Sequence, residues 1–436
     1  METASTPRRR ADAARNDELL LDAGLELLRE KGPDRLSALD LARRAGLTTG
    51  AVYARYENNE EILVGLWQNR LVGPLREFLT HTLQVLTSSE HMDNDPVEHA
   101  LHEPSMALLA AISVLIAAPR ITELGEVVIP DMQEILVELG ISEDSGDLLS
   151  TQRLGAISTG LGCLYFAAAD MFAGAEWPGI RSMMRFVASC TEFDTWPEIS
   201  PSTPFDYKVD TGHEIRDALV NAAAQVIARS GLERATTQRV ARAAGLPPSA
   251  LFAEYQNRQA LFSDVATKLL QSIYQEHRYS ILYGARQVPD TPVLPLQGWQ
   301  DPRLQQYRES MRTSVAENTM GLLSDIGHSH RRIRLEFQLA AIHNEEIRTE
   351  LQRVDESTNL MAAEILPSLF GLPTSIVGPG SRTTRAIAQG AMLLEDVSQM
   401  VSGRDIRPIN APLADYCCLD ALGLSTAPTS TILNHR

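Results

Sequence analysis

Apolar residues recur at helical spacing along most of the chain, separated by short stretches rich in polar residues, Gly or Pro. Near the N-terminus, Leu20, Ala23, Leu27 and Leu28 fall on one face of a helix that Gly32 ends. The same spacing predicts further helices at 60–86, 97–118, 122–139, 148–173, 180–190, 259–283, within 303–323, within 331–369, and at 383–401. The tail after residue 403 is expected to fall short of a full final helix. The pattern as a whole predicts an all-α protein.

Two short helices are expected to follow the first one. Ser37, with Asp40 three residues later, has the pattern of a capping box, and the helix that it opens ends at Gly46. Thr48 or Thr49 can cap the next short helix. Two short helices joined across a Gly-Leu turn, with alanines where the helices approach closely, are typical of a helix-turn-helix.

This segment occurs twice, at an offset of 199 residues and without gaps. About 44 aligned positions contain 13 identities, and the apolar positions between them also correspond. In the first copy the identical residues are Leu20, Ala23, Gly32, Arg35, Ala42, Arg43, Ala45, Gly46, Leu47, Ala51, Ala54, Tyr56 and Asn58. The chain therefore consists of two units of similar design.

The repeat and the composition between its copies set the expected domain boundaries. A head at 1–58 is followed by a helical body at 59–193, and a second head at 212–257 by a second body at 258–436. The linker between them, 194–211, is marked by Pro197, Pro201 and Pro204. A chain of 436 residues has the length for two or more such cores.

The repeated segment resembles the N-terminal domain of the TetR family. The first copy carries the resemblance on Ala23, Gly32, Ser37, Leu41-Ala42, Ala45-Gly46, residues 50–56 and residues 59–63. The second copy carries it on Ala222, Gly231, Thr236-Thr237, Val240-Ala241, Ala244-Gly245, residues 251–255 and residues 258–261. These motifs cover roughly a fifth of the chain. The resemblance implies two TetR-like units, each with an N-terminal three-helix helix-turn-helix head on a helical body that binds a ligand and dimerises.

The resemblance also implies which residues of the first head contact DNA. Ser37 would cap the second helix and offer its hydroxyl, with the helix N-terminus, to a phosphate. Tyr53 would donate its hydroxyl to a phosphate, with a buried aromatic anchor as the alternative, and Arg55 would pair with a phosphate or a guanine edge. The recognition helix would open in the major groove with Thr48, Thr49, Gly50 and Ala51.

Two features of the first head leave its phosphate contacts open. Asn59 stands where a Lys is usual in the family, so that contact is in doubt. The basic arm at residues 8–10 would restore charge by following the DNA backbone or the minor groove, and a solvated tail is the alternative. Tyr56 is expected to pack inward.

The second head departs further from the family pattern. Pro247 and Pro248 replace the two threonines, Phe252 lacks the phenolic hydroxyl, and Glu254 stands in the place of Arg55. The candidate contacts that remain are Thr236, Thr237, Arg239, Ser249 and Arg258. Two interpretations stay open: this head contacts DNA with a different preference, or it is kept for packing.

The resemblance further implies a pocket for a small, largely apolar effector within the bodies. Candidate lining residues are Met106, Tyr165 and Phe166 in the first half, and Phe337, His343 and Met392 in the second. Met and aromatic residues at helical spacing also serve as ordinary core, which is the alternative for each. The last two long helices of each half are expected to pair in a four-helix bundle, because residues 151–162 and 385–394 present small and apolar side chains.

Charge is distributed unevenly. The net charge is −17, which argues against a nucleic-acid partner when averaged over the chain. Basic residues nevertheless outnumber acidic ones at 8–56 and at 213–258, so the remainder is strongly acidic. This asymmetry is compatible with two mildly basic heads on acidic bodies, with ordinary scatter of surface charge as the alternative.

Other classes of protein find little support. The phosphate-binding G-x-x-x-x-G-K, the nucleophile motif G-x-S-x-G and the zinc motif H-E-x-x-H do not occur, so neither an enzyme nor a cofactor is expected. Cys163, Cys190, Cys417 and Cys418 form no CxxC pair, which disfavours a structural metal. Without a run of 18 apolar residues or an N-terminal leader, the protein is expected to be cytoplasmic and to have no membrane partner.

Two functions remain as hypotheses. The first is a sequence-specific transcriptional regulator, a repressor that binds a double-stranded operator and is released by a small effector. Both heads would then come from one chain as an intramolecular pseudo-dimer, with homodimerisation of two chains as an alternative. The second is a protein-interaction regulator whose degenerate helix-turn-helix heads have little affinity for DNA.

Overall fold

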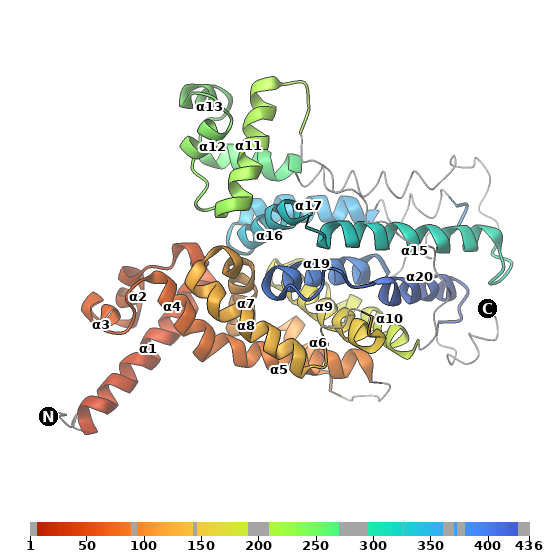
Figure 1. The fold of residues 1–436 in the computed structure, drawn as a ribbon, viewed down its shortest axis with the longest axis horizontal. Helices are drawn as coiled ribbons and strands as arrows, with labels where there is room; N and C mark the ends of the chain where they lie inside the picture. The colour runs from red at the N-terminus through yellow and green to blue at the C-terminus, as the bar shows by residue number, and fades with distance from the viewer. Residues whose placement is uncertain are drawn as a thin grey trace.

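The computed structural model describes residues 7–88, 94–142, 146–190, 209–269, 295–325, 327–360, 370–372 and 380–425. Every regular element within these ranges is a helix, which confirms the all-α prediction (Figure 1). Each of the two units begins with a three-helix head, and both heads lie toward the left of Figure 1, with the bodies extending to the right. Most of the predicted linker lies outside the described residues.

The first unit follows the predicted order of helices. Its head contains α1 (Pro7–Lys31), α2 (Ala38–Ala45) and α3 (Thr49–Tyr53). Gly32 follows α1 with a φ of 78°, a region that favours glycine, so the helix ends where predicted. Its body contains α4 (Asn59–Leu66), the π-helix η2 (Trp67–Leu71), α5 (Val72–Thr87), α6 (Pro96–His102), α7 (Met106–Ala117), α8 (Thr122–Glu138), α9 (Leu148–Ala168) and α10 (Trp177–Ser189).

The second unit repeats this design. Its head contains α11 (Glu214–Ser230), α12 (Thr237–Ala243) and α13 (Pro248–Glu254), and a further helical segment covers 258–269. The rest of the predicted helix up to residue 283 lies outside the described residues. The body contains α15 (Pro302–Leu323), α16 (His328–His343), α17 (Glu345–Leu360), α19 (Gly380–Ser398) and α20 (Arg407–Ala421).

Some predicted helices are interrupted by local chemistry. The predicted helix at 97–118 divides into α6 and α7, because Pro104 disfavours helical geometry at the preceding residue and Ser105 then caps α7. The segment predicted within 331–369 divides at Asn344, whose side-chain oxygen accepts the N–H groups of Glu346 and Ile347. Within 60–86 the helix continues through a π-turn, where the Trp67 indole N–H donates to Asp131 at 2.7 Å.

The expectation for the C-terminal tail is wrong, because α20 is a full helix after residue 403. Pro408 lies at its start, where a missing N–H costs little, and Pro412 lies one turn later. A contact distant in the sequence holds the helix: Asp415, which is buried, accepts from Arg308 Nε at 2.6 Å and from Arg312 Nη2 at 2.8 Å. Local sequence patterns carry no information about these two α15 partners.

The largest helix–helix contact among the described residues joins the two units. α9 of the first body crosses α19 of the second, in the two segments predicted to pair. At the crossing the backbones touch: a Cβ on Gly162 would lie 2.0 Å from the Ala386 carbonyl oxygen, and one on Gly390 would lie 1.9 Å from that of Ser158. α10 packs on α20 beside them, and α19 also packs on α8, so one continuous apolar core runs through both bodies.

α7 lies inside this core, with residues 108–117 buried on every side. In the described part of the chain, no single helix has the length and apolar composition of a membrane span. The pair Pro96–His102 and Met106–Arg120 meets that criterion only when taken together, with a bend of 80° between its members.

We expect Gly162→Ala to lower the free energy of unfolding by about 1–3 kcal/mol, because the added methyl group meets a backbone oxygen that no rotamer change can move. Urea unfolding followed by circular dichroism measures this loss. The matched control is Gly73→Ala in α5, where the new Cβ meets no atom within 4 Å and better helix propensity should leave stability unchanged or raised by up to about 1 kcal/mol. Equal stability of the two variants would contradict the close approach of α9 and α19.

Candidate nucleic-acid interface

The helix-turn-helix of the first head is held by two side-chain caps. Ser37 Oγ accepts the N–H of Asp40 at 3.2 Å at the start of α2, which confirms the predicted cap. Gly46 ends α2 in the left-handed conformation, with a φ of 67°. Thr48 Oγ1 then accepts the N–H of Ala51 at 3.2 Å and caps α3. The Thr48 hydroxyl is therefore occupied as the cap. Among the hydrogen bonds described, none within the turn involves the Thr49 side chain, so Thr49 is the better candidate to bind a base edge.

The start of α3 is presented to the outside. Thr48, Thr49 and Gly50 are exposed, and a Cβ on Gly50 would have only the Thr48 hydroxyl within 4 Å. Tyr53 is 59% exposed, which excludes the alternative of a buried aromatic anchor. Val52, on the opposite side, is fully buried. The helix therefore rests on one apolar residue and directs its polar face outward.

Arg55 lies just after α3 and has a partner within the head. Its guanidinium forms an ion pair with Asp17 of α1. Tyr56 packs inward against Gly65, as predicted, and burial raises the pKa of its hydroxyl. Any contact of Arg55 with a phosphate would thus compete with a carboxylate already beside it.

The second head keeps the architecture and changes the chemistry. Thr236 Oγ1 accepts the N–H of Arg239 at 3.2 Å and caps α12, as Ser37 caps α2. Pro247 and Pro248 open α13 without a side-chain cap. Phe252, at the position equivalent to Tyr53, is 58% exposed. Of the candidates, Thr236, Arg239 and Ser249 are exposed and Thr237 is half-buried.

The ion pair of the first head recurs in the second with its charges exchanged. Arg216 and Glu254 stand 199 residues after Asp17 and Arg55, and Arg216 Nε lies 3.4 Å from Glu254 Oε2. The Arg216 guanidinium also stacks on the Tyr255 ring at 5.5 Å. If Arg55 is compared with Glu254 alone, the second domain has lost a positive charge. When both residues of each ion pair are compared, the positive and negative charges have only changed places. The sequence signal for this exchange is the opposite charge at positions 17 and 216, which lie just outside the segment aligned for the repeat.

The two residues at the start of the next helix also turn back to their own heads. Asn59 Oδ1 accepts the N–H of Ala38 at 3.1 Å, so it ties α4 to the start of α2. Its equivalent, Arg258, donates to the carbonyl oxygens of Leu232 at 2.8 Å and Ala235 at 3.2 Å. In this structure the guanidinium of Arg258 therefore closes the turn before α12, and a phosphate contact by this residue stays a prediction.

The predicted effector-pocket residues occupy different environments. Tyr165, Phe337 and Met392 are almost fully buried, and Phe166 lies beneath the guanidinium of Arg382 at 5.2 Å. Met106 is 49% exposed at the start of α7. His343 lines a small pocket with Gly32, Asp34, Leu232, Glu336 and Leu339. The described residues contain no group of three His, Cys, Asp or Glu side chains arranged to hold a metal.

Comparison with known proteins agrees with this geometry. A family model described as "Bacterial regulatory proteins, tetR family" matches residues 20–66 and again 219–265, which are the two heads with the first helix after each. The chain therefore contains two tetR-family domains in tandem. A Bacillus subtilis (strain 168) protein, described as the uncharacterized HTH-type transcriptional regulator YvdT, is 30% identical to it over 78 residues. That alignment covers 18% of this chain and 36% of the length of the Bacillus protein.

Each tetR-family domain also touches the body of the other unit. His343, at the end of α16 in the second body, lies against Gly32 of the first domain, and its Nε2 is 3.1 Å from Ser113 Oγ of α7. Burial lowers the pKa of His343 to about 4. The neutral imidazole is therefore the form that fits between the first domain and the second body.

This burial predicts acid sensitivity. The unfolded chain takes up a proton on His343 near pH 6.5, whereas the folded chain does so only near pH 4, so the stability contributed at neutral pH is lost as the pH falls through that window. Between pH 7 and pH 5 we expect a loss of about 2 kcal/mol from this residue. In His343→Gln this part of the loss in unfolding free energy should disappear, while the losses from other titrating groups stay the same in both proteins. Urea unfolding at pH 7 and pH 5 measures the difference. The same pH dependence in both proteins would contradict the burial of a neutral imidazole.

Proposed function

We propose that this chain is a sequence-specific transcriptional regulator that binds a double-stranded DNA operator through its tetR-family domains. The observation that carries the proposal is the exposed, capped start of α3, with Thr49 and Tyr53 on its outer face and Val52 fixed beneath it. A helix held in this way presents its first residues to base edges in the major groove. Ser37, at the start of α2, supports a phosphate contact at a helix N-terminus.

The second domain is proposed to contact DNA with a different preference. The pair Arg216–Glu254 supports this, because the carboxylate that replaces Arg55 is compensated within the domain and adds little repulsion toward phosphates. Arg239 and Arg242 remain exposed on α12. With Pro247, Pro248 and Ser249 in place of Thr48, Thr49 and Gly50, α13 offers other groups to the base edges.

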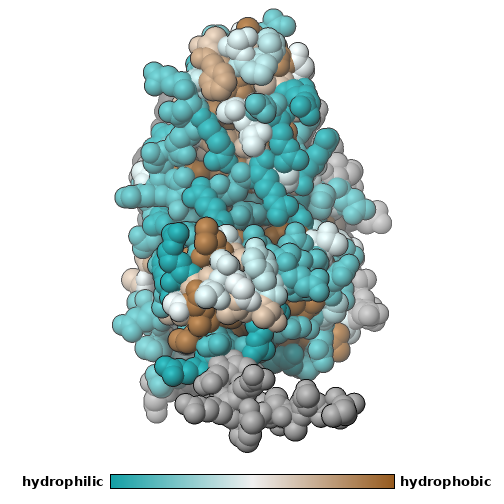
Figure 2. All heavy atoms as spheres, turned by 90° about the vertical axis from the view of Figure 1, so that its left-hand side faces the viewer, coloured by the Kyte–Doolittle hydropathy of each residue, from teal (hydrophilic) through white to brown (hydrophobic). Residues whose placement is uncertain are grey.

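A single chain is proposed to act as a pseudo-dimer. The close packing of α9 on α19 and of α10 on α20 supports this, since it is the pairing that two subunits would otherwise provide. Both domains lie on one side of the bodies; Figure 2 views that side and shows apolar spots at both domains within a mainly hydrophilic surface. We further propose that the regulator is a repressor and that a small apolar effector releases it.

The alternative, a protein-interaction regulator, is favoured by one observation. Phe252 and Ile215 on the second domain are exposed apolar side chains, and Glu254 lies close by. Salt dependence separates the two functions, because a DNA-binding protein releases counterions on binding and loses affinity steeply as salt is added. A purified chain that selects one sequence from a random DNA pool and is released by salt would support the regulator.

We expect Tyr53→Phe combined with Arg55→Ala to weaken operator binding by about tenfold or more, because the phenolic donor and a cation are both removed from the DNA face. The slope of log affinity against log salt should also fall by about 1. Electrophoretic mobility shift or fluorescence anisotropy measures both quantities. The matched control is Arg44→Gln, which removes a cation of the first domain that pairs with Glu26 and Glu30 of α1 and is not a candidate DNA contact. Thermal unfolding checks that Arg55→Ala leaves the fold intact. Unchanged operator affinity in the Tyr53, Arg55 variant would contradict the proposal that α3 contacts DNA.

The pseudo-dimer predicts an operator with unequal half-sites occupied by one chain. Light scattering of the DNA complex should give one chain per operator, and Arg239→Ala with Arg242→Ala should weaken binding because the second domain takes part. Two chains on a perfectly palindromic site, with no effect of the α12 substitutions, would contradict this architecture.

A further inference from the structure

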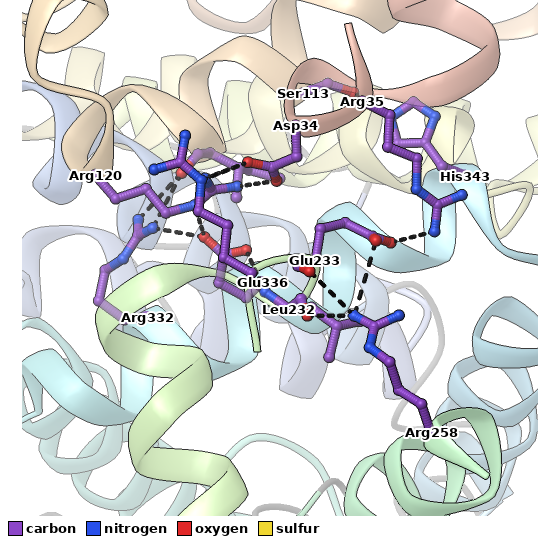
Figure 3. Close-up of polar contacts among 12 residues, drawn as sticks. Asp34, Arg35, Ser113, Arg120, Leu232, Glu233, Arg258, Arg332, Glu336 and His343 are labelled. Carbon is purple, nitrogen blue, oxygen red and sulfur yellow. Dashed lines mark hydrogen bonds and ion pairs between the residues drawn. The ribbon is translucent and has the colours of Figure 1, made fainter. Parts of the chain in front are cut away.

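The turns that follow the first helix of each domain face one another (Figure 3). Arg35 Nη2 of the first domain lies 2.6 Å from Glu233 Oε1 of the second, and Arg234 Nε of the second lies 3.7 Å from Asp34 Oδ1 of the first. Residues 233 and 234 are the equivalents of 34 and 35 at the offset of 199. The two domains therefore meet through a reciprocal contact, in which each turn gives one cation and one anion to the other.

Each turn also fits closely against the opposite body. A Cβ on Gly32 would lie 2.8 Å from Cδ2 of His343, which belongs to the second body. A Cβ on Gly231 would lie 2.7 Å from Cζ of Arg120, which belongs to the first body. Both glycines have a positive φ, 78° and 79°, so their backbones lie against these side chains with no side chain of their own between.

Arg120 is the centre of this junction. Its guanidinium is 6% exposed and binds both Asp34 carboxylate oxygens, at 2.7 and 2.5 Å, while its Nε donates to Glu336 at 2.5 Å. Glu336 belongs to α16 of the second body, and its other oxygen lies 3.4 Å from the Leu232 N–H. One side chain thus touches the first domain, the turn of the second domain and the second body, as Figure 3 shows.

The charges continue from this centre into the bodies. Arg332 donates to Glu336 at 2.9 Å and to Asp396 of α19 at 2.8 Å, and all of these groups are buried. Burial alone would lower the pKa of Arg120, but the charge of Glu336 and the hydrogen bonds with Asp34 outweigh burial and raise it. Buried ionised groups are stable only with their partners in place, so the arrangement permits one geometry rather than many.

We propose that this junction positions the two domains at one fixed separation and thereby makes the chain selective for the spacing between its two half-sites. Arg35, Arg234 and Arg120 are positioning residues in this proposal, because they act on the domains and not on DNA. The proposal rests on the proposed function, since spacing matters only if both domains contact DNA. The two half-sites of such an operator lie about one helical turn apart, roughly 34–36 Å. A rigid link resists a change of one or two base pairs, which alters both the distance and the rotation between the sites.

The exposed ion pairs of the junction, which Arg35 and Arg234 form, can be removed with little risk to the fold. The side chains of Arg35 and Arg234 are about half exposed, 53% and 49%, so Arg35→Gln with Arg234→Gln should leave the fold intact. The control is Arg44→Gln, which removes an arginine that pairs with Glu26 and Glu30 inside the first domain only. Exchange of the charges, Arg35→Glu with Glu233→Arg, should restore the spacing preference in part, because Glu233 also pairs with Arg258 at 3.8 Å. Arg120→Met probes the buried centre, with thermal unfolding to show whether it still folds.

The first measurement is affinity for a series of operators in which only the spacing between half-sites changes, one base pair at a time. The unsubstituted chain and Arg44→Gln should lose about tenfold in affinity when the spacing changes by one or two base pairs. In the double variant Arg35→Gln, Arg234→Gln, the same change of spacing should lower the affinity by only about threefold or less, while the affinity for a single half-site is unchanged. An unaltered spacing preference in both that variant and a folded Arg120→Met would overturn the proposal and leave the DNA-binding function standing.

The second measurement needs no DNA. Spin labels on Glu57→Cys and Gln256→Cys, two exposed and equivalent positions, report the distance between the domains. We expect a narrow distance distribution for the otherwise unsubstituted chain and a broad one for the Arg35, Arg234 variant. The charge exchange should narrow the distribution again in part. Equal distributions would overturn the positioning role. A chain that binds no operator would overturn the proposed function, and spacing selection with it, whatever the labels report.

Discussion

The contact of α9 with α19 at Gly162 and Gly390 is the constraint on which the rest of the structure depends. Helix backbones approach this closely only where neither carries a side chain at the crossing, and here each glycine faces a carbonyl group of the other helix. The two bodies consequently share one apolar core instead of meeting through separate surfaces. Both tetR-family domains pack on this shared core, the first through α1 on α7 and the second through α11 on α16.

Buried charge continues the same constraint toward the domains. Asp396 is on α19 itself, and the ion pairs that begin there pass through Arg332 and Glu336 to Arg120 and Asp34. Apolar contacts tolerate small shifts, whereas a buried guanidinium between two carboxylates requires its hydrogen-bond geometry. The path therefore links the core of both bodies to the first domain in one defined arrangement. A contiguous path of this kind is compatible with communication between the bodies and the domains.

Sequence patterns predicted what depends on near neighbours. The structure confirms the predicted roles of Gly32, Ser37 and Gly46, because capping and left-handed turns involve residues within four positions of each other. The prediction for the C-terminal tail is wrong because α20 depends on Asp415, whose partners Arg308 and Arg312 are more than a hundred residues away. The same limit applies at the candidate site. The family resemblance implies an exposed Tyr53 but leaves a buried anchor open, and only the structure decides between them. The Asp17 partner of Arg55 and the closure of a turn by Arg258 likewise appear only when separate helices are brought together.

Because the two units are joined in one chain, their sequences can differ, whereas the two subunits of a symmetric dimer are identical. In a homodimer, any residue at the interface appears on both sides, so a substitution changes two contacts at once. Here Gly32 meets a neutral histidine, whereas its equivalent Gly231 meets an arginine. The ion pair between Asp17 of α1 and Arg55 recurs in the second domain with its charges exchanged. The exchanged ion pair keeps the local contact because both of its partners differ together, and it leaves the second domain with a different charge distribution. Covalent linkage thus permits the two domains to diverge without loss of the shared core that holds them.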